Sequence, residues 1–142
     1  MSKSEGSRVE VTCHRTWSFA AGSEIPFTEP QVTTESPAGA VELARALQLN
    51  GAKMYGAFWC SHCFEQKQAF GMGAKADLPY VECYPDGYTG PRSIARACLD
   101  ANIQGFPTWI INGQKVEGDW PLPYLQSVLE GADPSVEARK YP

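Results

Sequence analysis

Helix-like and strand-like patterns of apolar residues alternate along the chain between Ser36 and Gly131. Ser36 suits a helix N-cap and Pro37 a first helical position, and an apolar stripe at helical spacing follows them as far as Asn50-Gly51, a plausible helix end. Three more helices are predicted: from Cys60 to about Phe70, from Pro91 across Ile94, Ala97, Cys98 and Ala101, and from Pro123 across Leu125, Val128 and Leu129.

Four segments have strand character. Lys53 to Trp59 is a mostly apolar run, Pro79 to Cys83 is a second, and Thr108–Ile111 and Gln114–Glu117 flank Asn112-Gly113, a strong two-residue hairpin signal. The order α-β-α-β-α-β-β-α predicts an α/β domain with a small four-stranded mixed sheet and helices on both faces.

The two ends of the chain differ from this middle part. Residues 1–36 are predicted to be a largely irregular N-terminal arm with at most one short strand, at Val9, Val11 and Cys13. Residues 37–131 form the predicted domain, and residues 132–142 a polar, loose C-terminal tail.

The composition of the chain argues against some classes of function. A formal net charge of -4 over 142 residues argues against a general nucleic-acid binder, which needs a basic surface. No apolar run approaches the roughly 18 residues that span a bilayer, and the polar start "MSKSEGSRVE" lacks the apolar core of a secretory signal. Five cysteines are an odd number, so the simplest arithmetic is two disulfides and one spare thiol.

The stretch "FWCSHC" is the most specific indication of a chemical activity in the sequence. Two residues between Cys60 and Cys63 at the start of a helix place the sulfurs side by side, as a cycling dithiol requires. Unpaired amide groups and the positive end of the helix dipole favour the Cys60 thiolate, and His62 can stabilise it further. A stabilised thiolate stabilises the reduced form, which makes the disulfide a better oxidant. Ser61 adds no bulk and leaves the approach open.

Two other interpretations of this pair stay open. Half of a zinc site is one, although Cys83 and Cys98 stand fifteen positions apart and on different predicted elements. Two inert buried thiols are the other, and a strand-to-helix junction at an exposed edge disfavours it. A redox pair is the favoured interpretation, and no metal is expected.

With "GFPTW" at residues 105–109, the succession of strand, "FWCSHC", helix, strand, helix and hairpin resembles the thioredoxin-like fold. The resemblance implies that Cys60 is the nucleophile, Cys63 the resolving thiol and Pro107 a cis-proline beside them. The backbone of Phe106 would then pair with an extended client segment. Trp59 and Phe106 would rim the site and offer clients an apolar surface.

The stretches "VTTESPAGAVELARALQLNGAKMYGAFWCSHCFEQK", "YVECYPDGY" and "IQGFPTWIINGQ" are similar to the thioredoxin-like domain fused to vitamin K epoxide reductase homologues of plants and cyanobacteria. This similarity runs from about Gln31 to Glu130. It implies a lumenal or periplasmic domain that passes disulfides between clients and a membrane-embedded, quinone-linked partner, with a second disulfide between Cys83 and Cys98.

The chain departs from these families in three respects. The membrane-spanning half is missing, and residues 1–30 have no counterpart. The buried acidic residue of many thioredoxins falls at Met54, so Glu65 or Glu82 would have to manage the proton of Cys63, although both suit ordinary surface charges. Cys13 lies outside the matched motifs and could form an intermolecular disulfide.

The predicted function is therefore a thiol–disulfide oxidoreductase of the thylakoid lumen or a similar oxidising compartment, which oxidises client proteins without an organic cofactor. The alternative is a non-catalytic thioredoxin-like scaffold subunit of a larger thylakoid membrane complex. An exposed Cys60 sulfur with an open groove at Phe106-Pro107 would favour the enzyme. A groove filled by the arm or a partner would favour the scaffold.

Overall fold

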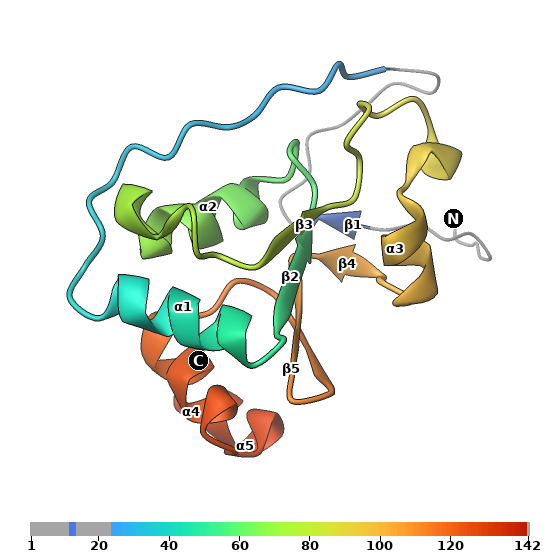
Figure 1. Ribbon diagram of the computed structural model, residues 1–142. Helices are drawn as coiled ribbons and strands as arrows, with labels where there is room; N and C mark the ends of the chain where they lie inside the picture. Colours follow the sequence, from blue (N-terminus) through green and yellow to red (C-terminus); the bar gives the residue numbers. More distant parts are fainter. Residues whose placement is uncertain (1–11, 14–23, 142) are drawn as a thin grey trace.

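The computed structural model (Figure 1) describes residues 12–13 and 24–141. Its main sheet has the strand order β3-β2-β5-β6, formed by β3 (Tyr80–Glu82), β2 (Lys53–Gly56), β5 (Thr108–Ile111) and β6 (Gln114–Glu117). β2 is parallel to β3 and antiparallel to β5, and β5 is antiparallel to β6. The mixed four-stranded sheet with flanking helices confirms the predicted α/β, thioredoxin-like class.

The helices are α1 (Ala40–Leu49), α2 (Ser61–Phe70), α3 (Arg96–Asp100), α4 (Leu122–Leu129) and α5 (Pro134–Ala138). Figure 1 shows α1, α2 and α4 on one side of the strands and α3 on the other. The predicted apolar stripe of α1 is its buried face, made of Ala40, Leu43, Ala44 and Leu47. Trp109 of β5 is fully buried in the core that these elements share.

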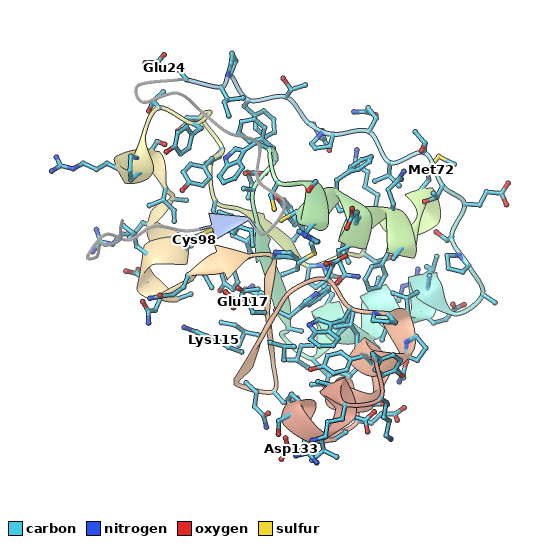
Figure 2. All side chains as sticks on the ribbon, turned by 180° about the vertical axis from the view of Figure 1, so that it is seen from behind. Glu24, Met72, Cys98, Lys115, Glu117 and Asp133 are labelled. Atoms are coloured by element: carbon cyan, nitrogen blue, oxygen red, sulfur yellow. A yellow bond between two sulfur atoms is a disulfide. The ribbon has the colours of Figure 1, made fainter. Side chains whose placement is uncertain are left out.

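The hairpin between β5 and β6 is confirmed. Asn112 and Gly113 both have positive φ, 52° and 78°, as a two-residue turn that follows the twist of the sheet requires. β6 is the outer strand of the sheet, and Figure 2 shows Lys115 and Glu117 along it. Both side chains are exposed, which is typical of a protected sheet edge.

Several predicted bounds are wrong. α1 begins at Ala40 with Gly39 as its N-cap, because the amide of Ala40 closes a turn onto the carbonyl of Pro37 instead of continuing a helix from Ser36. The single helix expected from Pro91 is two pieces, a 3₁₀ turn (Pro91–Ser93) and α3, since Ile94 and Ala95 are extended between them. β2 and β3 are shorter than the runs that predicted them.

The prediction of a loose C-terminal tail is also wrong. Residues 134–138 form α5, whose N-cap Asp133 accepts a hydrogen bond from the amide of Ser135 at 2.9 Å. Glu137 is buried, and Tyr141 packs edge-on against Tyr124 of α4. A capped helix that contacts α4 is therefore an extension of the domain.

The described part of the N-terminal arm is held against the domain. Ile25 exchanges two backbone hydrogen bonds of 2.8 Å with Tyr88, and the hydroxyl of Thr34 donates to the carbonyl of Gln68 in α2. Figure 1 shows this segment running along α2. Val9 and Val11, on which the arm's strand was partly predicted, lie outside the described residues.

A two-stranded parallel sheet lies beside the main one. β1 (Thr12–Cys13) pairs with β4 (Gly105–Phe106), and Cys13 is in register with Phe106 (Figure 1). One short strand was therefore correctly expected in the arm, and it adds to the segment that precedes Pro107.

Candidate functional site

Cys60 occupies the junction between β2 and α2. Its extended backbone, φ -96° and ψ 125°, makes it the N-cap residue of α2. Its amide donates to the carbonyl of Ala57 at 3.1 Å, which closes the turn that leads out of β2. The sulfur therefore lies at the positive end of the helix dipole, the position predicted from the sequence.

The two cysteines of the pair are in different states. Cys60 is disulfide-bonded, whereas Cys63 is a free, buried thiol, so the two are not joined to each other. The prediction of two disulfides and one spare thiol implied a spare outside the Cys60–Cys63 pair. Among the side chains that the structure describes, the free thiol is Cys63 itself. Both residues are only 1% exposed.

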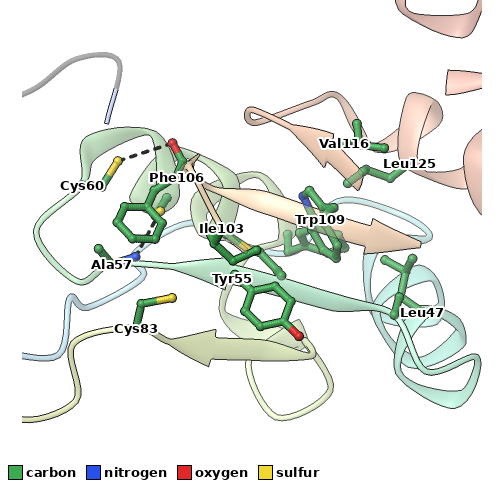
Figure 3. Packing of buried hydrophobic residues seen from close by; sticks show 14 of the residues in the cluster. Leu47, Tyr55, Ala57, Cys60, Cys83, Ile103, Phe106, Trp109, Val116 and Leu125 are labelled. Carbon is green, nitrogen blue, oxygen red and sulfur yellow. Dashed lines mark hydrogen bonds between the residues drawn. The ribbon is translucent and has the colours of Figure 1, made fainter. Parts of the chain in front are cut away.

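Burial defines the chemistry of Cys63. The backbone amide of Ala57 donates to its sulfur at 3.4 Å (dashed line in Figure 3). Loss of solvent nevertheless raises the pKa of the Cys63 thiol to about 12, because the low-dielectric surroundings disfavour the thiolate. Lys67 opposes this effect and the negative charge of Glu82 adds to it. Cys63 is therefore a neutral thiol near neutral pH.

Glu82, whose charge acts on this thiol, lies at the end of β3 and is half-buried. Its carboxylate accepts hydrogen bonds from the amides of Phe58 and Tyr84, each at 3.0 Å, and from the hydroxyl of Tyr80 at 2.8 Å. Burial raises the pKa of Glu82 in spite of these donors. The expectation that Glu82 is an ordinary surface charge is wrong, while Glu65, the other candidate, is exposed.

His62 lies between the cysteines in α2 and is half-buried. Its Nδ1 is 2.9 Å from a carboxylate oxygen of Asp119 and 3.3 Å from one of Glu65. Among the described residues, these three side chains are the group whose potential metal-ligating atoms come together, within 4.8 Å of one another. Asp119 was not identified from the sequence, because a loop fifty-seven positions away gives no local signal.

The backbone carbonyl of Phe106, next to Pro107 in the chain, faces the Cys60 sulfur. The Sγ of Cys60 lies 3.7 Å from the carbonyl oxygen of Phe106 (dashed line in Figure 3), and the Phe106–Pro107 peptide bond is cis. The structure thus brings together the predicted nucleophile and the predicted client-pairing backbone, although they are 46 positions apart. β1 pairs with this same backbone.

The side chains of Trp59 and Phe106 belong to an aromatic cluster. Trp59 packs against Phe106, Tyr84 and Tyr88 with ring centroids 5.6–5.8 Å apart. Trp59 is 5% exposed and Phe106 is fully buried. The expectation that these two side chains offer clients an exposed apolar surface is therefore wrong, because they pack on each other. Ser61 is half-buried.

Cys83 and Cys98 are joined by a disulfide with an S–S distance of 2.06 Å. The bond links the end of β3 to α3 across 15 positions, and both residues are fully buried. Because no zinc can bind cysteines in a disulfide, these two are not the other half of a zinc site with Cys60 and Cys63.

Gln66 is a residue that sequence reasoning missed. Its side chain is buried, donates to the carbonyl of Trp120, and accepts from the indole of Trp109 and the amide of Trp120. A glutamine on the face of α2 that also carries Cys63 and Phe70 was the available signal. It fixes α2, and with it the cysteine pair, to β5.

Among the described residues, no helix is long and apolar enough to cross a membrane.

Comparison with known proteins shows a similarity to a thiol-disulfide oxidoreductase. No family model matches the chain. Over 102 residues, 72% of its length, the chain is 51% identical to Thiol-disulfide oxidoreductase LTO1 of Arabidopsis thaliana, and it spans 27% of that protein's length. A continuous match of this length within 142 residues includes Cys60, Cys63, Cys83 and Cys98. The similarity therefore covers these four cysteines and about a quarter of the relative.

Proposed function

We propose that this protein is a thiol–disulfide oxidoreductase that exchanges disulfides with client proteins through Cys60 and Cys63. The observation that carries the proposal is the position of the Cys60 sulfur, at the N-cap of α2 and 3.7 Å from the carbonyl of Phe106. Half identity to a protein named a thiol-disulfide oxidoreductase supports it.

In the proposed reaction a client thiolate attacks Cys60 of a Cys60–Cys63 disulfide, and Cys63 leaves with the electron pair and takes up a proton. A second client thiolate then attacks the client sulfur bonded to Cys60 and expels the Cys60 thiolate, which the start of α2 stabilises. The client gains a disulfide and the protein becomes a dithiol, so two electrons pass from client to protein.

Glu82 is the proposed partner of Cys63 in proton transfer. Partial burial raises the pKa of the Glu82 carboxyl, which makes it a better proton acceptor than an exposed carboxylate, and Glu82 acts electrostatically on Cys63. It takes the place of the acidic residue that thioredoxins carry at the position of Met54. We propose that His62, held by Asp119, favours the reduced form and hence the oxidising direction.

The resemblance to vitamin K epoxide reductase homologues supports two finer proposals. The protein would pass the electrons from clients to a membrane-embedded, quinone-linked partner, and it would do so in the thylakoid lumen. The Cys83–Cys98 disulfide is in keeping with an oxidising compartment.

A scaffold without catalysis is the second candidate, and two observations favour it. Cys60 is only 1% exposed, and β1 already pairs with the Phe106 backbone. By the criterion set out from the sequence, a filled groove counts toward the scaffold. A reversible occupant of the groove is compatible with the enzyme, whereas a permanent one is not.

The test is stoichiometric oxidation of a reduced, unfolded client. Oxidised protein is mixed with reduced ribonuclease, and client thiols are counted after an acid quench and alkylation. The proposal predicts that two client thiols disappear for each protein reduced, and that Cys60→Ser abolishes the reaction. Cys63→Ser in thiol form should trap a mixed disulfide with a disulfide-containing client. If wild type and Cys60→Ser leave the client equally unoxidised, the scaffold is the better account.

A further inference from the structure

The arm strand β1 occupies the place where a client strand is expected to bind. Its partner β4 is the backbone segment just before Pro107, and Cys13 is in register with Phe106. The carbonyl of that same Phe106 lies 3.7 Å from the Cys60 sulfur. A cysteine of the chain itself is therefore placed, by its backbone, opposite the residue that contacts the candidate nucleophile.

The state of the other cysteines leaves one partner for Cys60. Cys60 is disulfide-bonded, Cys63 is a free thiol, and Cys83 is bonded to Cys98. The chain has five cysteines, so Cys13 is the cysteine that remains. Cys13 is in register with Phe106, and the Cys60 sulfur lies 3.7 Å from the carbonyl of that residue, so β1 brings the backbone of Cys13 to the strand that Cys60 contacts.

We propose that Cys13 is a third redox-active cysteine, which forms a disulfide with Cys60 and holds the chain's own N-terminal strand in the client site. The inference rests on the proposed exchange chemistry of Cys60 and adds a specific residue and state to it. In this capped state the protein carries an internal analogue of the mixed disulfide that a client would form.

The step needs no external oxidant. The Cys13 thiolate attacks Cys60 of the Cys60–Cys63 disulfide, so that the Cys13–Cys60 bond forms and the Cys60–Cys63 bond breaks. Cys63 leaves with the electron pair and takes a proton from water, replacing the proton that Cys13 lost to solvent. One disulfide is exchanged for another, and the total number of electrons is unchanged.

One physical feature favours the capped state and another prolongs it. Cys13 is tethered to the same chain, so its effective concentration at Cys60 is on the order of millimolar or more, and the β1–β4 pairing orients it. The thiol of Cys63 is buried and has a pKa raised to about 12, so it is a neutral thiol at pH 7. It is therefore both a slow leaving group and a slow attacking group, so this feature prolongs the capped state once it has formed and does not shift the equilibrium.

The test is disulfide mapping on the full chain. Free thiols are alkylated at low pH, and the protein is digested with trypsin without reduction. Cys13 falls in the tryptic peptide 9–15, and Cys60 and Cys63 fall together in peptide 54–67. The inference predicts that these peptides are linked in the wild type, and that the link is absent from Cys13→Ser and Cys60→Ser. Fragmentation should place it at Cys60.

Client kinetics supply the second readout. If the capped form makes up nine-tenths of the oxidised protein, Cys13→Ser should oxidise reduced ribonuclease about ten times faster, since the competent fraction rises by that factor. A matched change elsewhere in the arm, Thr34→Ser, controls for general effects of substitution there. It keeps the hydroxyl that contacts Gln68 and should leave the rate unchanged.

The outcomes separate the two proposals. In one outcome the protein oxidises the client, Cys13 is found alkylated in every sample, and Cys60 is found bonded only to Cys63. That outcome overturns the inference and leaves the proposed function standing. A Cys13–Cys60 link without any client oxidation supports the bond and overturns the proposed function. An unchanged rate in Cys13→Ser, with the link present in the wild type, overturns the capping role.

Discussion

Gly56 offers a direct test of how tightly the resolving thiol is packed. A Cβ atom at this position would lie 2.7 Å from Cε1 of Tyr80 and 2.8 Å from the sulfur of Cys63. Ordinary contacts between such atoms are about 3.5–4.0 Å, so Gly56→Ala requires each neighbour to retreat by roughly 1 Å. The backbone of Gly56 does not itself exclude alanine, because its φ is not in the left-handed region.

Specific contacts hold both neighbours in place. The Tyr80 hydroxyl is held by Glu82 at 2.8 Å, Lys67 lies 3.6 Å above its ring, and the Cys63 sulfur is fixed by the amide of Ala57. Overpacking of this kind destabilises a core by about 1–3 kcal/mol. We expect Gly56→Ala to lower the free energy of unfolding by that amount and to slow the resolution of mixed disulfides by Cys63.

Urea unfolding measures the first effect, provided that the slope of the transition is unchanged. The second effect is measured, with Cys63 present, as the single-turnover decay of the mixed disulfide that Cys60 forms with a disulfide-containing client. The matched control is Gly73→Ala, whose Cβ would lie 3.0 Å from the Ser36 hydroxyl, with only Ser36 and Val41 atoms as its nearest neighbours. That hydroxyl has no hydrogen-bond partner among the described atoms and can rotate away. A Gly56→Ala protein within about 0.5 kcal/mol of the parent, with an unchanged resolution rate, would refute the packing described here.

Three further outcomes are expected. In Cys60→Ser, the ¹³Cβ signal of Cys63 should keep its thiol position through pH 10, because burial raises the pKa to about 12; a midpoint near the ordinary 9.0 would contradict that burial. Replacing Cys83 and Cys98 together by alanine should lower the free energy of unfolding by about 3 kcal/mol in denaturant titrations, since the bond closes a loop of 15 positions; no change would exclude a stabilising role. Gln66→Met should lower it by roughly 1–3 kcal/mol, measured in the same way, because the buried indole of Trp109 loses its acceptor. An unaltered midpoint would show that water or another group replaces the amide.

Local signals predicted the framework of the fold. The Asn112-Gly113 turn, the apolar stripe of α1 and the Cys60 N-cap depend on neighbouring residues, and all three are present in the structure. The prediction of one helix from Pro91 was wrong because the apolar residues keep helical spacing through Ile94, whereas the backbone of Ile94 is extended and interrupts the helix. The tail was misjudged because its polar composition hid the Asp133 cap of α5.

The parts of the site that depend on distant segments were not predictable from the sequence. Nothing in the local sequence of Asp119 indicates that it meets His62, and nothing near Glu82 shows that three donors surround its carboxylate. The polar neighbours of Cys13 gave no sign that it belongs to the site. Only the pairing of β1 with β4 places it opposite Phe106.

The most direct test of the central claim is a thiol-trapping redox titration of Cys60 and Cys63 in glutathione buffers, with Cys60→Ser and Cys13→Ser beside the wild type. In Cys13→Ser, where Cys13 cannot compete for Cys60, we predict a reduction potential of the Cys60–Cys63 couple between about -120 and -200 mV. This is the range of disulfide donors and isomerases. A couple near about -270 mV would contradict the proposed oxidising direction. If Cys60 does not exchange with glutathione in any of the redox buffers, the claim that this pair is redox-active fails.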